Sequence, residues 1–484
     1  MQQLTLYWGA QPVRAPRAMV VSPETNATEI GVRILRDGGN AVDAAVAMGF
    51  ALAVTHSAMC GLGGGGQALV RKADGSMAFF DFREQAPRRA YRDFFLDKPE
   101  AASTRGWLAA AVPGHVAGFE NLHAWYGRRR WETLLQPAYK LASAGHVVSY
   151  QRGQSGGVFP SPGELYVQPD LAHTIRRLAE RGAAEFYSGE TARQLAAEME
   201  RNGGLITASD LAQYSVDLLE PHKAKYRGLE VATASGSSAG GISLLQMLSA
   251  LETTGFEKHG WGSAAAIHEM AKVMRRAFAD RARNEPGRMR SLEKPCTTHF
   301  AVADGEGNVA AVTITLNGQF GSGVVVPGLG FLLNNNMDNF ATRPGQPNRY
   351  GLVQEAANAI QPGKRPPSSM TPTIVLKGGR PHLVLGTPGG PTIPNSVLQT
   401  LVNVADFGMN AQQAVTAPRI HHQWLPDVLY MEPGFSPDTI DLLRGRGHTV
   451  EIRGSNNDMM AILFEERWIQ GAVDPRREGK AAGY

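Results

Sequence analysis

Hydrophobic residues recur at helical spacing in several segments of the chain. Ile30 and Ile34 share one face of the first segment, and the glycine pair Gly38-Gly39 separates it from the next. The pattern predicts helices over 27–36, 41–54, 171–178, 267–278 and 394–407. Most of the predicted helix therefore falls in the first 280 residues.

Alternating apolar residues interrupted by turn residues predict three strand hairpins. They lie within 68–84 around Asp74-Gly75, within 299–317 around residues 305–308, and within 371–386 around Gly378-Gly379. Helices and hairpins occur in both halves of the chain, without a regular alternation of single strands and helices. This arrangement predicts an α+β protein built from stacked layers of helix and antiparallel sheet.

The composition is that of an ordinary soluble protein: of 484 residues, 43% are hydrophobic and 19% are charged. The net charge is +4, and the basic residues are dispersed apart from short clusters such as Arg128–Arg130, which is typical of a solvated helix end. A nucleic-acid partner is therefore not expected. The N-terminus has no basic start followed by an apolar run, and no segment is long enough to span a membrane, so we expect a cytoplasmic protein without membrane contact.

Neither the cysteines nor the histidines indicate a metal site. Cys60 and Cys296 are far apart and stand in no zinc-binding spacing. His421 and His422 are adjacent, and adjacent residues of a strand point to opposite faces of the sheet. We therefore expect no metal, and nothing in the sequence indicates an organic cofactor.

The sequence CTTH at 296–299 places two threonines at the head of a predicted strand. A threonine hydroxyl is a weak nucleophile unless a base takes its proton, and one known base is the α-amino group of an N-terminal threonine. Cleavage before Thr297 would create such a terminus, and the charged, Pro-containing segment 284–296 is predicted to be an exposed loop. On these residues alone, an ordinary strand threonine is the simpler interpretation.

Ordered motifs along almost the whole chain resemble the γ-glutamyltransferase (γ-glutamyltranspeptidase) family. They are GGNAVDAAVA at 38–47, LGGGG at 62–66, DFRE at 81–84, VPGHVAGF at 112–119, NGGLIT at 202–207, TTHF at 297–300, TITLN at 313–317, LLNN at 332–335, RPPSSM at 365–370, GTPGG at 386–390 and APRIHHQWLPD at 417–427. The resemblance implies a four-layer αββα N-terminal-nucleophile hydrolase that cuts itself into a large subunit, 1–296, and a small subunit, 297–484. The two subunits would stay together, and a dimer of such heterodimers is a further expectation.

The same resemblance implies catalytic roles for several residues. Thr297 matches the nucleophile, which would attack the carbonyl of Cys296 and give an ester by an N-to-O acyl shift that water then releases. Thr315 matches the threonine that orients the nucleophile. Gly389 and Gly390 match the backbone donors of an oxyanion hole, a role that suits glycine because its N–H group can approach an oxyanion closely. Without that context, GTPGG would be interpreted as a plain turn.

Other matching residues would bind the substrate. Arg83 matches the arginine that pairs with the substrate's α-carboxylate, and Ser368 and Ser369 match the serines that assist it. Tyr350 matches a lid tyrosine of some members, and Asn317 matches part of the set that holds the α-ammonium. Taken alone, Arg83 would be a solvated arginine after a strand, and the serine pair would be a turn after two prolines.

The amine-binding motif departs from the family pattern. Members that bind the γ-glutamyl ammonium typically carry LLNNQMDDF, whereas this chain has LLNNNMDNF, with Asn336 and Asn339 in place of the glutamine and the second aspartate. The ammonium would lose its anionic partner, and a charge-assisted hydrogen bond contributes about 1.5–3 kcal/mol. We therefore hypothesise an acyl group that carries a carboxylate but no α-amine, such as glutaryl. A small dicarboxylic monoamide such as oxamate and an ordinary γ-glutamyl amide are the alternatives.

Two further features bear on function. The segment between ADRAR at 279–283 and Thr297, and the stretch after residue 148, are shorter than the family usually carries, which fits a cytoplasmic catabolic enzyme. A non-cutting relative that only binds ligands is the remaining alternative, and loss of Thr297, Gly389 or Arg83 would have favoured it. All three are present, so the expected partners are a small-molecule amide and the chain's own second subunit.

Overall fold

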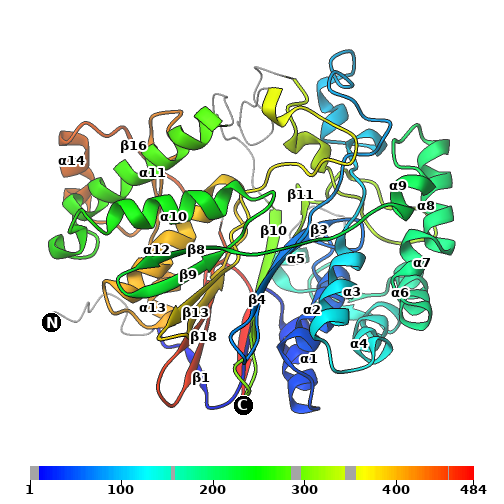
Figure 1. The fold of residues 1–484 in the computed structure, drawn as a ribbon, viewed down its shortest axis with the longest axis horizontal. Coiled ribbons are helices and arrows are strands. Elements are labelled where there is room, and N and C mark those ends of the chain that lie inside the picture. Colours follow the sequence, from blue (N-terminus) through cyan, green and yellow to red (C-terminus); the bar gives the residue numbers. More distant parts are fainter. Residues whose placement is uncertain (1–9, 154–158, 285–295, 344–355, 456) are drawn as a thin grey trace.

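Two large β-sheets form the centre of the molecule (Figure 1). The computed structural model describes residues 10–153, 159–284, 296–343, 356–455 and 457–484. Each sheet has seven strands among these residues, and every pair of neighbouring strands in the two sheets is antiparallel. Antiparallel pairing fits the hairpins that the sequence predicts.

The first sheet mixes strands from both ends of the chain. In spatial order its strands are β1 (Val13–Ala15), β18 (Ile469–Val473), β17 (Met460–Phe464), β13 (Arg380–Gly386), β12 (Thr373–Lys377), β9 (Leu229–Thr233) and β8 (His222–Tyr226). The hairpin β12–β13 occupies its middle, so the chain that follows β13 leaves from the centre of the sheet.

The second sheet mixes early and late strands as well. In spatial order its strands are β19 (Lys480–Gly483), β2 (Met19–Ser22), β10 (Cys296–Ala303), β11 (Val309–Asn317), β3 (Gly65–Arg71), β4 (Met77–Phe82) and β7 (Asp217–Leu219). The hairpin β10–β11 lies at its centre. Two minor sheets contain β5 (His146–Val147) with β6 (Leu165–Tyr166), and β14 (Ile420–His421), β15 (Leu429–Met431) and β16 (Val450–Ile452).

Helices cover the outer face of each sheet, on opposite sides in Figure 1. Beside the second sheet lie α1 (Thr25–Arg36), α2 (Ala41–Thr55), α3 (His115–Tyr126), α4 (Trp131–Ser143), α5 (Tyr150–Gly153), α6 (Pro169–Arg181), α7 (Ala184–Tyr187), α8 (Glu190–Arg201) and α9 (Ala208–Ala212). Beside the first sheet lie α10 (Ala239–Leu251), α11 (Ala264–Asn284), α12 (Ile393–Ala405), α13 (Ala411–Thr416) and α14 (Pro437–Gly445).

Three apolar cores hold these layers together. One packs α1 to α4 and α6 to α9 against the second sheet and includes Phe300 of β10, and another packs α10 to α14 against the first sheet and includes Leu385 of β13. The third lies between the sheets and includes Leu69, Phe79 and Ile462. The order helix, sheet, sheet, helix confirms the predicted α+β, four-layer αββα architecture.

Helix α2 shows how the sequence builds the innermost part of this core. All fifteen of its residues are buried, which agrees with its small apolar side chains. A capping box at its start, in which Asn40 and Asp43 satisfy each other's backbone N–H groups, fixes the first turn. The helix can therefore pack closely under the second sheet without unpaired polar groups at its N-terminus.

The predicted elements agree well with the structure. The five predicted helices correspond to α1, α2, α6, α11 and α12, and the three hairpins to β3–β4, β10–β11 and β12–β13. The loop predicted over 284–296 falls almost entirely on 285–295, and Tyr350 falls on 344–355; both segments lie outside the described residues.

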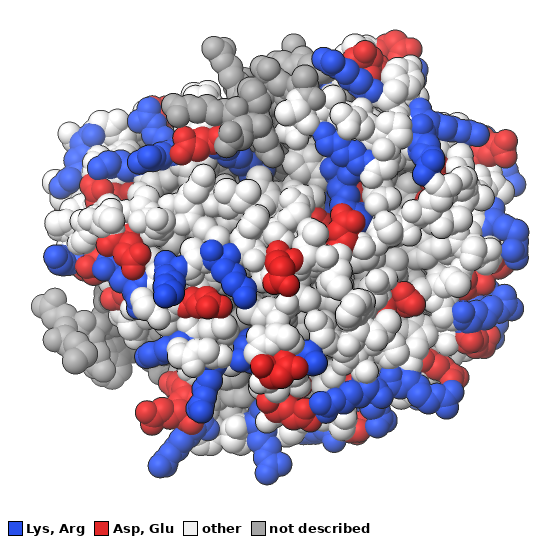
Figure 2. Space-filling view, in the orientation of Figure 1, with Lys and Arg blue, Asp and Glu red and all other residues white. Residues whose placement is uncertain are grey.

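Charged side chains of both signs are interspersed on the face shown in Figure 2. This dispersal agrees with the small net charge and gives no basic stripe on that face. Among the described residues, no helix is long and apolar enough to cross a membrane. A cytoplasmic location stays a prediction.

Candidate functional site

The hairpin β10–β11 contains an irregularity at the position of the predicted nucleophile. Cys296 pairs with Asn317 and Thr297 with Thr315, so that Leu316 is an extra residue on β11. Asn317 has a φ of 76°, a left-handed conformation that asparagine tolerates better than most residues. Bulges of this kind occur next to active sites because they redirect side chains.

Thr315 connects the predicted nucleophile to the peptide that precedes it. Its Oγ1 lies 3.0 Å from Oγ1 of Thr297 and donates to the carbonyl oxygen of Cys296 at 2.9 Å. The backbone N–H of Asn317 donates to the same Oγ1 at 2.8 Å. Because a hydroxyl has one proton, Thr297 is the donor in the contact between the threonines. Thr315 thus orients the Thr297 hydroxyl and polarises the neighbouring carbonyl.

The two adjacent threonines face different layers. Thr297 lies on the same face of β10 as Ala301 of the core between the sheets, and it lines a small cavity there. Thr298 lies on the face of Phe300, toward the core between the second sheet and its helices, which also contains Cys60. Strand alternation therefore separates their environments, and only Thr297 reaches the cavity.

The cavity beside Thr297 has a volume of about 40 Å³ in this uncut chain. Its lining consists of Arg83, Arg281, Thr297, Thr315, Asn317, Asn339, Pro367, Ser368, Ser369, Met370, Gly390, Pro391 and Ile393. Eight of these are residues that the sequence predicts to be catalytic or substrate-binding. Three others of that set adjoin it: Asn336 bonds to two lining residues, Cys296 precedes Thr297, and Gly389 precedes Gly390.

The predicted oxyanion loop follows β13 and leads into α12. Gly389 has a φ of 142° and Gly390 a φ of 56°, conformations in which residues with a Cβ are strained. A Cβ on Gly389 would also collide with Nδ2 of Asn457. Glycine is therefore favoured by backbone geometry at both positions and by space at Gly389.

The four glycines at 63–66 pack closely against neighbouring backbone, including that of β11. A Cβ on Gly64 would collide with the carbonyl oxygen of Thr315, and one on Gly63 with the carbonyl of Leu332. Close backbone approach explains these glycines, because a glycine has no Cβ to separate the two chains.

Arg83 follows β4 and is buried, with 2% of its surface exposed. Its Nη2 donates to Oδ1 of Asn336 at 2.9 Å, while its Nε has no hydrogen-bond partner among the described residues. The neighbouring carboxylate of Glu84 lies 3.7 Å from Nη1, and burial raises the pKa of Glu84 although Arg83 opposes that change. A buried guanidinium with an unpaired N–H is suited to receiving a carboxylate.

Three asparagine side chains form a cluster beside Arg83. Nδ2 of Asn339 donates to Oδ1 of Asn317 at 3.1 Å and to Oδ1 of Asn336 at 2.7 Å. The bond from Arg83 fixes the direction of the Asn336 amide, because only its oxygen can accept from a guanidinium. The NH₂ group of Asn339 therefore occupies a position between two acceptor oxygens.

The serine pair borders the cavity from the first sheet's side. Oγ of Ser368 accepts from the backbone N–H of Met370 at 3.0 Å. Oγ of Ser369 accepts from Nη1 of Arg281 at 2.9 Å. Arg281 lies at the end of α11, and the sequence interpretation missed it because nothing in the local pattern of that helix distinguishes it from a solvated arginine.

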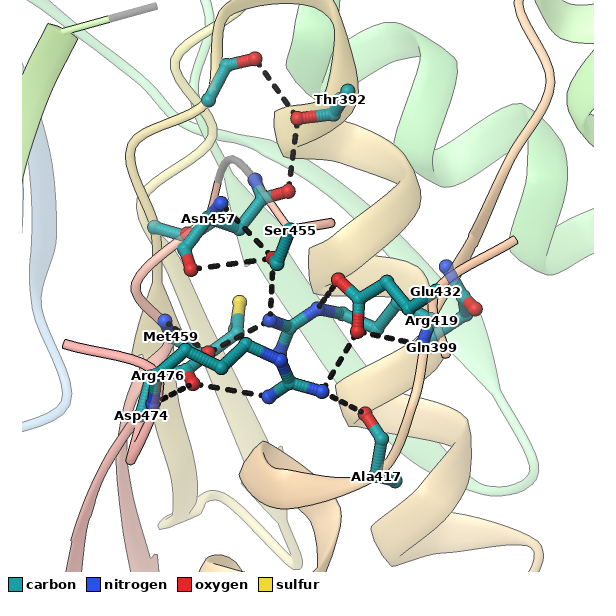
Figure 3. A network of polar contacts seen from close by, with 12 residues as sticks. Thr392, Gln399, Ala417, Arg419, Glu432, Ser455, Asn457, Met459, Asp474 and Arg476 are labelled. Atoms are coloured by element: carbon teal, nitrogen blue, oxygen red, sulfur yellow. Dashed lines mark hydrogen bonds and ion pairs between the residues drawn. The ribbon is translucent and has the colours of Figure 1, made fainter. Parts of the chain in front are cut away.

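A network of ionic side chains is connected through Ser455 and Asn457 to the predicted oxyanion loop (Figure 3). Nη2 of Arg419 contacts Oδ2 of Asp474 at 2.7 Å, and Nη1 of Arg476 contacts Oδ1 of Asp474 at 3.0 Å. Glu432 pairs with both arginines. Burial alone would raise the pKa of Asp474, but the two guanidinium charges outweigh it and hold the pKa below its usual value.

Replacement of this carboxylate should destabilise the fold in a pH-dependent way. We expect Asp474→Asn to lower the free energy of unfolding at neutral pH by about 3–5 kcal/mol, because the buried guanidinium of Arg419 and the partly buried one of Arg476 lose their shared partner. Because the pKa of Asp474 is lower in the folded than in the unfolded protein, its ion pairs stabilise the fold at pH values above the unfolded-state pKa near 3.9. This stabilisation is lost as pH falls through the lower pKa of the folded state. The difference in Tm between wild type and variant should therefore be large at pH 8 and 6 and shrink as pH falls below 4.

Asp441→Asn is the matched control, since Asp441 pairs with Arg444 in an exposed ion pair. Its Tm should change little at any pH. An equal loss of Tm in both variants would show that the buried network contributes no more to stability than the exposed ion pair.

Among the described residues, no cluster of three or more His, Cys, Asp or Glu side chains could hold a metal ion. Nδ1 of His421 contacts Asn395, and Nε2 of His422 contacts Asp427, so the two rings bind different neighbours.

Cys296 faces a second, larger cavity of about 740 Å³. Polar and charged residues such as Glu24, Arg152 and Arg477 line it. Thr297 does not belong to its lining, so the peptide between Cys296 and Thr297 lies between the two cavities.

Comparison with known proteins relates this site to a described family. The sequence model of the family Gamma-glutamyltranspeptidase matches residues 27–286 and 284–484. The chain is 42% identical to the glutathione hydrolase proenzyme of Escherichia coli K12, over 98% of this chain and 93% of that protein. It is 34% identical to the acylase ACY 1 proenzyme of Pseudomonas sp. SE83, over 97% and 94% of the two chains.

A solved structure agrees with these sequence matches. The cephalosporin acylase from Bacillus halodurans superposes with a TM-score of 0.86 at 26% identity, and the match covers 100% of this chain and 99% of that chain. The four-layer architecture is thus shared with a structure that bears the name of an acylase.

Proposed function

This chain belongs to the γ-glutamyltranspeptidase family of N-terminal-nucleophile amidohydrolases, and from that premise we propose that it cuts itself before Thr297 and then hydrolyses an amide through an ester on that threonine. The acyl group that it accepts carries a carboxylate and needs no α-amine. The amide of Asn339, which already fills the place between two acceptor oxygens, is the observation that carries the substrate part of this proposal.

The cleavage step uses contacts already present in the uncut chain. Oγ1 of Thr297 attacks the carbonyl carbon of Cys296, the peptide C–N bond breaks, and an ester forms while the nitrogen becomes a free amine. Thr315 donates to the Cys296 carbonyl oxygen at 2.9 Å and can stabilise the charge that develops there. Water then splits the ester, leaving the Cys296 carboxylate and the Thr297 hydroxyl.

Turnover uses the amine that cleavage has produced. The α-amino group of Thr297 takes the hydroxyl proton while Oγ1 attacks the substrate amide, and the proton goes to the leaving amine. The N–H groups of Gly389 and Gly390 stabilise the oxyanion of the tetrahedral intermediate. Water attacks the resulting ester and releases the acid. Thr297 is the catalytic nucleophile in both steps, and Thr315 orients it.

Substrate selection follows from Arg83 and the asparagine cluster. The unpaired Nε of the buried Arg83 favours a carboxylate in the acyl group. An α-ammonium would have to compete with the NH₂ group of Asn339 for Oδ1 of Asn317 and Oδ1 of Asn336. Two donors facing each other repel, and Asn339 brings no negative charge in compensation. A glutaryl amide avoids this conflict, while its carboxylate can still reach Arg83, Ser368 and Ser369.

The test compares two chromogenic substrates on the purified protein. A denaturing gel and intact mass first establish whether the chain has become fragments of 296 and 484 − 296 = 188 residues. We then expect kcat/KM for glutaryl-p-nitroanilide to exceed that for γ-glutamyl-p-nitroanilide by about tenfold or more, from the loss of a charge-assisted bond.

Each other outcome has a definite meaning. A preference for γ-glutamyl would refute the substrate class and leave an ordinary γ-glutamyl hydrolase. Activity on oxamate alone would identify a small dicarboxylic monoamide hydrolase. A chain that stays uncut and inactive would refute the nucleophile assignment itself.

A further inference from the structure

Two carbonyl groups of the oxyanion loop are held by side chains on its far side. Nδ2 of Asn457 donates to the carbonyl oxygen of Pro388 at 2.7 Å. Oγ1 of Thr392 donates to the carbonyl oxygen of Gly389 at 2.8 Å, and its backbone N–H does so at 3.2 Å. These carbonyls belong to the peptide units that carry the N–H groups of Gly389 and Gly390.

A carbonyl that is held in place also fixes the N–H of the same peptide unit. In a planar trans peptide the C=O and N–H bonds point in opposite directions. Gly390 lines the cavity beside Thr297, whereas Asn457 and Thr392 do not. Asn457 holds the Pro388 carbonyl, so the N–H of Gly389 points away from Asn457, and Thr392 does the same for the N–H of Gly390. Because glycine has no Cβ, these peptide units would otherwise rotate with little steric resistance.

We propose that Asn457 and Thr392 are positioning residues for the reaction, which hold the two oxyanion-hole N–H groups in their productive orientation. The inference rests on the proposed function, because it assumes that an oxyanion forms against Gly389 and Gly390. Neither side chain touches the reacting atoms: both act through the backbone of the loop.

The surroundings of Asn457 make its orientation definite (Figure 3). Its Oδ1 lies 3.0 Å from Oγ1 of Thr392, so the single hydroxyl proton of Thr392 is shared between this oxygen and the Gly389 carbonyl oxygen. The backbone N–H of Asn457 donates to Oγ of Ser455 at 3.1 Å. Nη2 of Arg419 donates to the same Ser455 oxygen at 3.0 Å. The ionic network around Arg419 and Asp474 is thus connected through Ser455 to the residue that holds the loop. The Pro388 carbonyl also accepts from the adjacent Thr387 hydroxyl at 2.8 Å, but that donor moves with the loop.

Self-cleavage and turnover should respond differently to loss of these contacts. The carbonyl that is attacked during cleavage is that of Cys296, and it accepts from Thr315, not from the glycine loop. The substrate carbonyl during turnover depends on the loop. A variant with a misdirected loop should therefore still cut itself and yet turn over slowly.

The experiment measures cleavage and steady-state kinetics for Asn457→Asp and Thr392→Val. Asn457→Asp keeps the side-chain shape but replaces the donor by an oxygen that repels the Pro388 carbonyl. Thr392→Val removes the hydroxyl with little change of volume. We expect complete cleavage before Thr297 in both, nearly unchanged KM, and a fall in kcat of about 100-fold for Asn457→Asp, comparable to loss of an oxyanion donor. The fall for Thr392→Val should be smaller, since its backbone N–H still holds the Gly389 carbonyl.

Two controls separate positioning from structural damage. Thr400→Val removes a buried hydroxyl from α12 that has no hydrogen-bond partner among the described residues. This variant should leave kcat unchanged. Thr392→Ser restores the donor and should recover kcat.

Unchanged kcat in Asn457→Asp, an equal fall in Thr400→Val, or no recovery in Thr392→Ser would overturn the proposal. So would a variant that fails to cut while the wild type cuts. A wild-type chain that does not cut would instead refute the proposed function.

Discussion

Thr297→Ala is expected to give a single chain of 484 residues with no amidase activity. The substitution removes the hydroxyl that attacks the Cys296 carbonyl and the hydroxyl that later carries the acyl group. Loss of a nucleophile that acts as part of a unit reduces kcat by up to about 10⁶-fold. Intact-mass spectrometry after purification and a p-nitroaniline release assay measure the two effects separately.

Thr298→Ala is the matched control for that experiment. The neighbouring threonine is also buried, but it lies on the other face of β10 and does not line the cavity. The Thr298→Ala variant should be cut normally before Thr297 and keep its amidase activity. If Thr298→Ala stays uncut while Thr297→Ala is cut, the nucleophile is the second threonine and the assignment is wrong.

Asn339→Asp is expected to shift substrate preference toward γ-glutamyl amides. The change removes the NH₂ group between Oδ1 of Asn317 and Oδ1 of Asn336 and supplies a carboxylate for the ammonium. A charge-assisted bond of about 1.5–3 kcal/mol corresponds to a 10- to 150-fold rise in the ratio of kcat/KM for γ-glutamyl- over glutaryl-p-nitroanilide. The ratio corrects for any loss of folded enzyme.

Asn339→Ala separates the effect of adding a carboxylate on substrate preference from the effect of removing the amide. It takes away the same NH₂ group without adding a carboxylate, so the ratio should rise much less than in Asn339→Asp. An unchanged ratio in the aspartate variant would mean that the ammonium is bound elsewhere or is not excluded at all.

The sequence predicted those parts of the fold whose signal is local. Alternation over 299–317 and the turn at 305–308 predicted β10–β11, and glycine and asparagine at 38–40 predicted the boundary between α1 and α2. These signals work because side-chain periodicity and caps depend on residues only a few positions apart. The assignment of Thr297 as the predicted nucleophile, and of most residues around it, came from matching ordered motifs, since a threonine on a strand has no distinctive pattern of its own.

The remaining features of the site depend on contacts between distant segments. Arg281 meets Ser369 across 88 positions, and Arg419 meets Asp474 across 55. Asn457 reaches the Pro388 carbonyl across 69 positions. Such pairs are fixed by sheet order and register, and the spacing of residues along one segment carries no information about them.

The strand order determines how cleavage would affect the ability of the protein to refold after unfolding. Five ladders, β1–β18, β2–β10, β2–β19, β3–β11 and β9–β12, join a strand before Thr297 to a strand after it. The fragments of a cut chain would stay associated through both sheets, each fragment lacking strands that the other supplies. The uncut chain refolds as one molecule, whereas the cut pair would have to meet again in solution, at a rate that falls with dilution. Cutting therefore turns a folding equilibrium into a largely one-way assembly.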